Sequence, residues 1–319
     1  MNLRIGSRGS QLALWQANHI SALLRGEGHS VEIEIIKTTG DRLQEVTFAQ
    51  VGSKGMFTKE IEEALAEGRV DLAVHSLKDL PTELPEPFAL AATPPRVDPR
   101  DVLVSVHHAS LEALPLGARV GTSSQRRRAQ LKALRPDIEA VEFRGNVDTR
   151  LRKLAEGQVE AILLAAAGLD RLEKTEWVRE RLEPRDFCPA AGQGSLGIET
   201  RKGDAATIAA VAFLNDPETR FAVTAERAAL AALGGGCQVP IGIYCRVDTA
   251  AEPDDANAPW VEIFGVVAAP ESGEAVRIYH RVPQASAEPV ALGRLAAQML
   301  IEAGAGPLLE AQASGGSAR

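Results

Sequence analysis

Short apolar runs alternate with amphipathic segments from the first residues onward, and this alternation constrains the fold more than any other feature. The spacing predicts a helix over residues 10–28, with Ser10 as its N-cap, and a second helix over 57–68. Strands are predicted at 3–7, 31–39 and 70–77. The order strand, helix, strand, helix, strand is typical of a parallel sheet with right-handed crossovers.

The same alternation resumes after a proline-rich stretch, residues 93–101. The predicted elements are strands at 101–106, 118–121, 138–143 and 160–169, with helices at 124–134 and 147–156. Two α/β units joined near residues 94–100 are therefore expected, with a cleft between them. Sheets of this kind bind their ligands at strand ends.

A third pattern begins near Pro217. A helix is predicted over 218–233, three alternating runs follow at 241–247, 260–268 and 275–282, and a closing helix covers 288–304. This order predicts a small antiparallel sheet with two helices.

The net charge of −8 argues against general nucleic-acid binding, but the charge is unevenly distributed. Residues 119–153 contain ten Arg or Lys and four Asp or Glu. Phe143 is the one aromatic residue in that segment, so base stacking has little to use. A small polyanionic ligand fits this segment better than DNA does, although on charge alone a solvated surface is equally acceptable.

Cysteine content and hydropathy predict a cytoplasmic protein without disulfides or membrane contact. Cys188, Cys237 and Cys245 are sparse, odd in number and lack metal-ligand spacing, so no metal is expected. No run of eighteen apolar residues occurs, and the first ten residues have no signal-peptide core.

Arginines follow two predicted strand ends in the second unit. After Gly121, hydroxyl residues can cap a helix whose free N–H groups favour anions. Helical steps of about 100° allow at most two of Arg126, Arg127 and Arg128 to face one ligand. Arg144 and Arg150 repeat the scheme at the next strand end. Guanidinium groups bind carboxylates in bidentate fashion, so a ligand with several carboxylates is indicated.

The first unit offers further candidates. Arg8 and Ser10 lie at a strand-to-helix turn, and Lys78 and Asp79 follow a buried strand. Asp79 is either a salt-bridge partner or a group that stabilises a developing cation and passes protons. The glycine-rich stretch before Phe57 lacks the Lys-Ser/Thr of a phosphate loop, and we expect a loop in which Phe57 closes over the cleft. His75, inside an apolar strand, is expected to be structural.

Cys237 lies in the stretch GGGCQVPIG, where three glycines precede the thiol. Glycine allows close approach of bulky groups at an entropic cost to folding. A buried structural cysteine gains nothing from such a loop, whereas a thiol that carries a large group needs it.

Nine stretches, in this order, resemble one known family: SRGSQLALWQA, VGSKGMFTKE, DLAVHSLKDLP, GTSSQRRRAQL, RGNVDTRL, AAAGLDRL, PAAGQGSLGIE, AERAAL and GGGCQVPIG. Together they closely resemble the porphobilinogen deaminases, also called hydroxymethylbilane synthases. The resemblance covers about residues 3–245 and is weaker beyond them.

The resemblance implies an α/β fold with two domains like type 2 periplasmic binding proteins and a small α+β third domain. The expected domains are 1–94, completed by about 195–213; the arginine-rich 100–194; 217–308, which anchors a cofactor; and a disordered tail, 309–319. It implies a monomeric transferase that condenses four porphobilinogens head to tail, releasing ammonia, into linear hydroxymethylbilane. Its primer is a dipyrromethane cofactor bound to the matching cysteine, Cys237, through a thioether.

Roles for single residues follow from the same resemblance. Asp79 matches the catalytic aspartate, placed to hydrogen-bond pyrrole N–H groups and to stabilise the cation formed when ammonia leaves. The residues expected to bind the cofactor besides Cys237 are Lys78, Ser123, Arg126, Arg127, Arg144 and Gln193. The residues expected to bind substrate are Arg8, Ser10, Arg150 and Arg171.

Two other classes of function remain open. One is a carboxylate-binding receptor on the same two-domain fold, against which the Cys237 loop counts. The other is a regulatory protein that contacts nucleic acid through the arginine cluster, against which the acidic composition counts.

Overall fold

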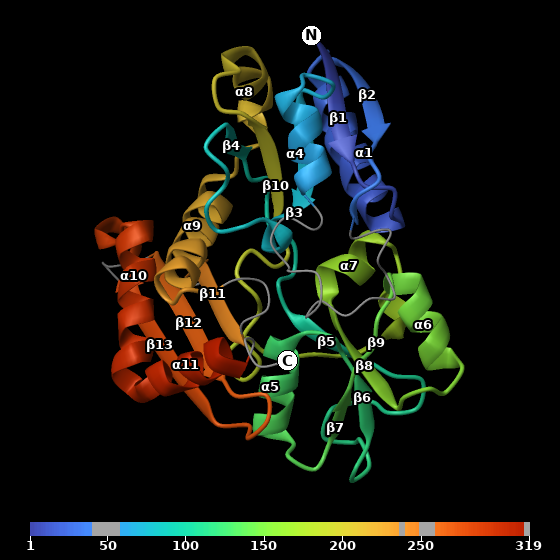
Figure 1. Ribbon diagram of the computed structural model, residues 1–319, viewed down its shortest axis with the longest axis vertical. Helices are drawn as coiled ribbons and strands as arrows, with labels where there is room; N and C mark the ends of the chain where they lie inside the picture. The colour runs from blue at the N-terminus through green and yellow to red at the C-terminus, as the bar shows by residue number, and fades with distance from the viewer. Residues whose placement is uncertain (40–57, 236–239, 249–258, 316–319) are drawn as a thin grey trace.

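The computed structural model describes residues 1–39, 58–235, 240–248 and 259–315, which form three units (Figure 1). The first unit lies at the top of Figure 1, the second below it and the third at the left. Each unit is built on one sheet, with five, five and three strands. In the described ranges, no helix combines the length and the apolar character needed to cross a membrane.

The first sheet takes one strand from a distant part of the chain. Its spatial order is β2 (Ser30–Ile35), β1 (Asn2–Ser7), β3 (Leu72–Ser76), β10 (Leu196–Arg201) and β4 (Phe88–Ala92). Strands β1, β2 and β3 are parallel as predicted, but β10 runs antiparallel to both of its neighbours. The parallel arrangement predicted for the first three strands is confirmed, and β10, which enters from the second unit, adds an antiparallel strand that was not predicted. The helices are α1 (Gln11–Gly26) and α4 (Lys59–Ala66).

The second sheet repeats this plan. Its spatial order is β7 (Glu139–Val141), β6 (Arg119–Gly121), β8 (Ala161–Ala165), β5 (Asp101–Val104) and β9 (Val178–Arg181). The helices are α5 (Gln125–Leu134), α6 (Val147–Ala155), α7 (Ala166–Arg171) and the 3₁₀ helix η2 (Thr175–Trp177). Strand β5 is antiparallel to β8 and β9 for the same reason: it enters from the first unit.

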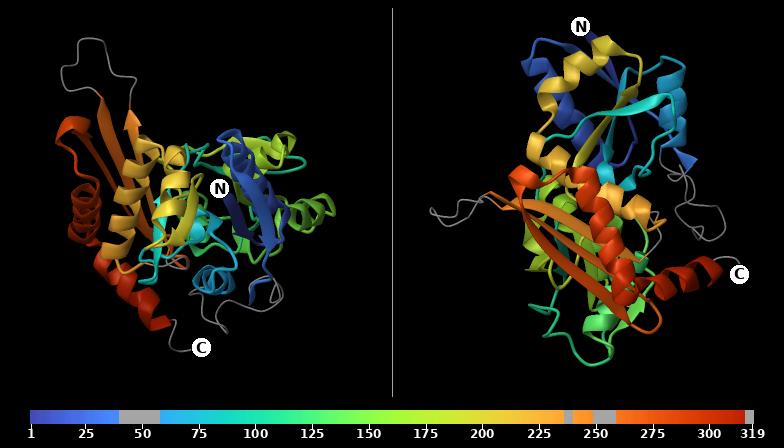
Figure 2. Two further views of the ribbon diagram at one scale, coloured as in Figure 1. Left: turned by 90° about the horizontal axis from the view of Figure 1, so that it is seen from above. Right: turned by 90° about the vertical axis from the view of Figure 1, so that its left-hand side faces the viewer.

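The third unit is a three-stranded antiparallel sheet covered on one face by two helices (Figure 2). Its elements are α9 (Pro217–Ala232), β11 (Ile241–Asp248), β12 (Trp260–Ala268), β13 (Ala275–Pro283), η4 (Gln284–Ser286) and α10 (Pro289–Leu300). Apolar side chains from α9, α10 and the sheet form one core. On the other face, Tyr244 and Phe264 pack against Ala129 of α5, which fixes the third unit to the second.

Two connections join the first and second units, residues 93–100 and the segment before β10. After β10, α8 (Ala205–Val211) and η3 (Ala212–Leu214) lead into α9. The predicted fold class, two α/β units and a small α+β unit with an antiparallel sheet, is confirmed.

The chain end differs from the prediction. After η5 (Ile301–Ala305), α11 runs over Gly306–Gly315, so a disordered tail from residue 309 is wrong for residues 309–315. Leu308 is buried and Leu309 packs against the core of the third unit, which gives this segment a reason to be helical. Strands β4 and β9, which are short and weakly alternating, were not predicted.

Candidate active site

An open cavity of about 70 Å³ lies at the carboxyl ends of β1 and β3. Its lining includes Arg8 and Ser10 from the turn after β1 and His75 and Asp79 from the end of β3. The Ser10 hydroxyl caps α1 by accepting a hydrogen bond from the Ala13 N–H, as predicted. The turn that begins α1 therefore forms one wall of the cavity.

Asp79 ends the 3₁₀ helix η1 (Leu77–Asp79), which follows β3 directly. Its side chain is exposed, and within the described residues it forms no hydrogen bond or ion pair. A carboxylate in this position can accept hydrogen bonds from a ligand without first breaking a contact within the protein.

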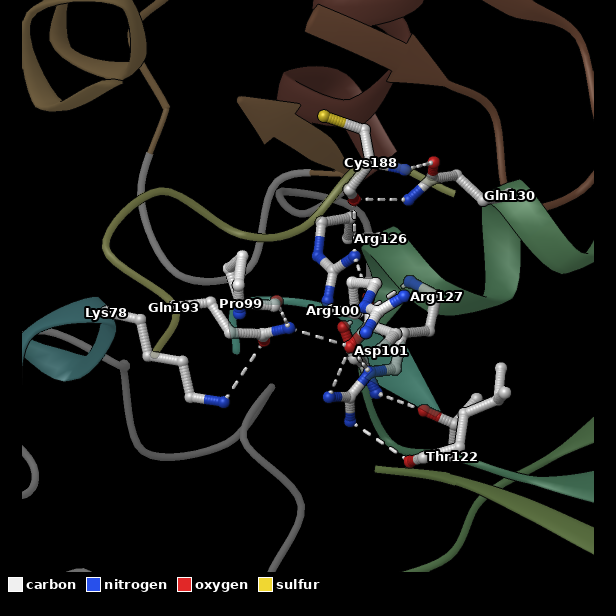
Figure 3. A network of polar contacts seen from close by, with 12 residues as sticks. Lys78, Pro99, Arg100, Asp101, Thr122, Arg126, Arg127, Gln130, Cys188 and Gln193 are labelled. Carbon is white, nitrogen blue, oxygen red and sulfur yellow. Dashed lines mark hydrogen bonds and ion pairs between the residues drawn. The ribbon is translucent and has the colours of Figure 1, made fainter. Parts of the chain in front are cut away.

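Lys78 and Gln193 connect the first unit to the second (Figure 3). The Lys78 ammonium donates to Gln193 Oε1 at 3.3 Å, and Gln193 Nε2 donates to Asp101 Oδ1 at 3.0 Å and to the Pro99 carbonyl at 2.7 Å. Burial, together with the nearby positive charges of Arg127 and Arg126, lowers the pKa of Lys78 to about 8. Lys78 therefore faces a positive environment at the junction of the two units.

Glycines hold Gln193 in this place. Gly192 and Gly194 have φ values of +74° and +89°, which residues with a Cβ rarely adopt. A Cβ on Gly194 would lie 2.6 Å from the Val97 carbonyl oxygen. The segment before β10, which contains Gly194, thus packs closely against residues 93–100. This close approach places the buried Gln193 side chain between Lys78 and Asp101.

Arg126 and Arg127 both bind Asp101, the first residue of β5. Arg126 Nη1 lies 2.6 Å from Asp101 Oδ2, and Arg127 Nη2 lies 2.7 Å from Oδ1. Arg128, the next residue along α5, turns away and pairs with Glu142 at 3.6 Å. The helical geometry that limited the cluster to two arginines is confirmed, and both converge on a carboxylate of the protein itself.

Asp101 was not among the predicted site residues. The proline-rich stretch before it indicated only a hinge, although an acid placed directly before an apolar run could have been noticed. It is fully buried, and the adjacent guanidinium groups hold its pKa far below the usual range despite that burial. One carboxylate therefore faces Arg126, Arg127 and, through Gln193, Lys78, which leaves positive charge in excess.

Arg144 and Arg150 lie beside this cluster. Arg144 Nε donates to Glu142 Oε1 at 2.6 Å, and Arg150 Nε donates to the Gly145 carbonyl at 2.8 Å. No described carboxylate forms an ion pair with Arg150, and burial beside Arg127 lowers its pKa to about 10. Arg150 is a half-buried cation that forms no ion pair with a described carboxylate, although the charge of Glu142 lies nearby.

Arg171, at the end of α7, spans the two α/β units. It donates to the Gly194 carbonyl at 2.8 Å, and its guanidinium lies 5.9 Å from the Trp15 ring centroid on α1. Burial lowers its pKa to about 10. Ser123, between Gly121 and α5, is half-buried, and no hydrogen bond of its side chain occurs within the described residues.

Two predicted residues, Cys237 and Phe57, lie outside the described residues. The other cysteines are buried in apolar surroundings, where burial raises the pKa of Cys188 to about 12 and that of Cys245 even more. Both thiols are therefore poor nucleophiles.

Comparison with known proteins gives consistent matches along the chain. A family model described as "Porphobilinogen deaminase, dipyromethane cofactor binding domain" matches residues 3–209, and one described as "Porphobilinogen deaminase, C-terminal domain" matches residues 220–302. A porphobilinogen deaminase of Trichlorobacter lovleyi is 47% identical over 310 residues, covering 97% of this chain and 96% of that protein. A porphobilinogen deaminase of Nitratidesulfovibrio vulgaris is 56% identical over 241 residues, which cover 75% of this chain and 76% of that protein. Among solved structures, a putative methionine-binding lipoprotein of Bacillus subtilis matches 67% of this chain and 89% of its own, with a TM-score of 0.42 and 13% identity.

Proposed function

Because the chain belongs to the porphobilinogen deaminase family, we propose that it condenses four porphobilinogen molecules head to tail, with loss of ammonia, into linear hydroxymethylbilane. Each porphobilinogen brings two carboxylates, so a growing chain needs many fixed cations. The single observation that carries the proposal is the Asp79 carboxylate, without a described partner, at the edge of a surface with excess positive charge.

Asp79 is the proposed catalytic residue. Breaking the carbon–nitrogen bond of the aminomethyl group leaves positive charge on the pyrrole, and a fixed carboxylate at that point lowers the energy of the charged state. The cavity position after β3 keeps Asp79 on a rigid strand end while its side chain remains accessible. One carboxylate can serve every cycle.

The proposed cofactor is a dipyrromethane attached to Cys237. Its carboxylates would be held by a set of residues around the Asp101 network, namely Lys78, Ser123, Arg126, Arg127, Arg144 and Gln193. These residues fit an anionic group, because the cations exceed the one buried carboxylate, and a guanidinium bound to Asp101 still has N–H groups to donate. When bound, the dipyrromethane supplies the pyrrole carbon to which the first porphobilinogen is joined.

Incoming substrate would contact a second set of residues: Arg8, Ser10, Arg150 and Arg171. Arg8 and Ser10 line the cavity with Asp79. Arg171 is buried and Arg150 is half-buried, and because burial lowers the pKa of both, a carboxylate beside either one would stabilise its charge. Phe57 is the proposed lid over this space.

The proposal extends to organisation. We propose three domains, with 1–94 completed by about 195–213, then 100–194 and 217–308, in a cytoplasmic monomer that acts without metal, nucleic acid or membrane. Strand β10, which joins the first sheet after the second unit is complete, fits these bounds.

Intact-protein mass spectrometry tests the function directly. The purified protein should carry an adduct of two pyrrole units, and limiting porphobilinogen should give a ladder of one to four further units. Cys237→Ser should lack the adduct, whereas Cys188→Ser and Cys245→Ser should retain it. Product formation without any ladder, or a full adduct on Cys237→Ser, would contradict the tethered mechanism. A protein that binds porphobilinogen without releasing ammonia would be a receptor instead.

A further inference from the structure

A group of three ionisable side chains, two buried and one half-buried, lies beside the cavity that contains Asp79. His75 comes from β3, Glu199 from the neighbouring strand β10, and Glu62 from α4, which packs on both strands. His75 Nε2 lies 3.0 Å from Glu199 Oε2, and both side chains are buried. The sequence predicts a structural role for His75, and this pair by itself is compatible with one.

The two carboxyl groups retain unused hydrogen-bonding capacity. Oε1 of Glu199 and Oε1 of Glu62 are buried, and neither has a hydrogen-bond partner among the described residues. Buried polar atoms are normally paired, so two such oxygens beside one imidazole need an explanation. Burial and the nearby charge of Glu199 raise the pKa of Glu62, so Glu62 retains its proton more readily than an exposed carboxyl group does.

His75 connects this pair to the cavity. The ring lines the cavity together with Asp79, while its Nε2 contacts Glu199. Nδ1 has no hydrogen-bond partner within the described part of the chain. The charged groups around the ring are Glu199 on β10, Glu62 on α4, and Asp79 and Arg8, which line the same cavity.

The proposed reaction needs a temporary place for a proton, and the inference rests on that function. In each cycle the carbon–nitrogen bond breaks and ammonia leaves with the electron pair. A carbon–carbon bond then forms, and the attacked pyrrole carbon loses one proton. Ammonia and this proton both leave the site in each cycle, so no oxidant or other reactant is required. Asp79 must nevertheless stay ionised while that proton is in the site.

We propose that His75, with Glu199 and Glu62 behind it, holds the proton released in each condensation until that proton passes to solvent. The imidazole receives the proton on the cavity side, and the carboxyl pair stabilises the imidazolium that results. Asp79 thereby remains an anion throughout elongation. A His75–Glu199 pair with only a structural role would need neither a ring that lines the cavity nor a further carboxyl group, Glu62, beside it.

Glu199→Gln in the full chain with its cofactor tests this assignment. The amide keeps the size and can still hydrogen-bond to His75, but it cannot stabilise an imidazolium as an anion does. We expect kcat to fall about tenfold with KM within about twofold, and the pH profile of kcat to shift toward acid, because the imidazole without an anionic partner holds its proton less tightly. Glu34→Gln, on the outer strand β2, and His29→Gln, beside the amino terminus, are the matched controls and should change neither quantity.

A readout independent of turnover is the ¹⁵N NMR titration of the histidine side chains, with the His75 signal identified by its loss in His75→Gln. Glu199→Gln should move the His75 midpoint toward acid. If Glu199→Gln does not fold, Glu62→Gln on the surface side of the cluster should give a smaller shift in the same direction and a kcat about threefold lower. Unchanged kcat and pH profile in whichever variant folds would overturn the inference, as would a His75 titration that does not respond. A wild-type holoenzyme that forms no hydroxymethylbilane would instead overturn the proposed function, whatever the titration shows.

Discussion

At the scale of single residues, Asp101 determines what the arginines of α5 can do. Its carboxylate forms ion pairs with both guanidinium groups and accepts a hydrogen bond from the Gln193 amide, so the arginines are fixed in place before any ligand binds. Burial alone would raise the pKa of this carboxyl, but the two arginines outweigh burial and lower it. Preorganised cations lose little freedom on binding an anion, which suits a site that meets new carboxylates repeatedly.

Asp101→Asn should lower the free energy of unfolding by about 3–5 kcal/mol, because two buried guanidinium groups lose their anion. Since the folded-state pKa lies below the unfolded value of about 4, the ionised form stabilises the protein above that pH. This contribution declines as the pH falls below it. Urea unfolding at pH 7 and pH 3 measures the free energy of unfolding at each pH. This free energy should fall less from pH 7 to pH 3 in the variant than in the wild type. Asp137→Asn, which breaks an exposed pair with Arg135, is the control and should change stability little. If Asp101→Asn and Asp137→Asn lowered the free energy of unfolding equally, the buried network would contribute no more stability than the exposed pair.

Asp79→Asn should retain the fold and the cofactor but lose activity by about 100-fold or more. The amide has nearly the same shape, yet it cannot offset a developing positive charge. Initial rates of hydroxymethylbilane formation, with the adduct mass measured on the same sample, check this expectation. Glu86→Gln, an exposed acid on the following loop, should keep full activity. A near-wild-type rate for Asp79→Asn would show that Asp79 is a surface carboxylate without a catalytic role.

At the scale of elements, the third unit depends on the contact between α9 and α10. A Cβ placed on Gly293 of α10 would lie 2.2 Å from the Ala225 carbonyl oxygen of α9. The two helices therefore approach backbone to backbone at this point, and no side chain fits between them. The contact holds the helices against the sheet that follows the Cys237 loop.

Gly293→Ala should destabilise the protein by about 1–3 kcal/mol, although alanine favours a helix by about 1 kcal/mol over glycine. The steric overlap is with backbone, which cannot move aside as a flexible side chain would. Thermal unfolding followed by circular dichroism measures the change. Gly26→Ala, at the end of α1, meets nothing within 4 Å and should be neutral or slightly stabilising. Stabilisation by both substitutions would show that the helices can separate without cost.

At the scale of the whole molecule, the cations available to carboxylates are spread over both α/β units rather than gathered at one point. Arg8 lies in the first unit, Arg150 in the second, and Arg171 reaches between them to Gly194 and Trp15. Up to eight carboxylates accumulate as four pyrroles are added in the proposed reaction. Different cations should then matter at different chain lengths.

Arg150→Leu should make the protein accumulate at particular steps of the mass ladder instead of lowering all steps equally. A carboxylate that loses its buried cation at one stage is costly to desolvate at that stage alone. Arg152→Leu, two residues along α6 and exposed beside Glu156, is the matched control and should leave the ladder unchanged. Identical ladders for both variants would identify Arg150 as part of a solvated surface.

The sequence predicted most of this architecture because its signals are local. The amphipathic helices, the Ser10 and Ser124 caps and the alternating strands of the third unit all depend on neighbouring residues. The antiparallel β10, the Asp101 network and the pairing of His75 with Glu199 depend on residues that meet only after folding. The roles expected for Asp79 and Cys237 came from the resemblance of their motifs to a known family. The spacing of the residues alone does not indicate these roles.

The position of β10 also affects how the chain folds as it leaves the ribosome. β10 lies between β3 and β4, so the first sheet cannot be completed until residues 196–201 have been synthesised. The second sheet needs nothing beyond Arg181. Domains generally fold as their chain emerges, amino-terminal ones first, but here the middle of the chain can finish before the beginning. Until β10 arrives, β3 and β4 each expose an unpaired edge, and such edges can pair with other chains.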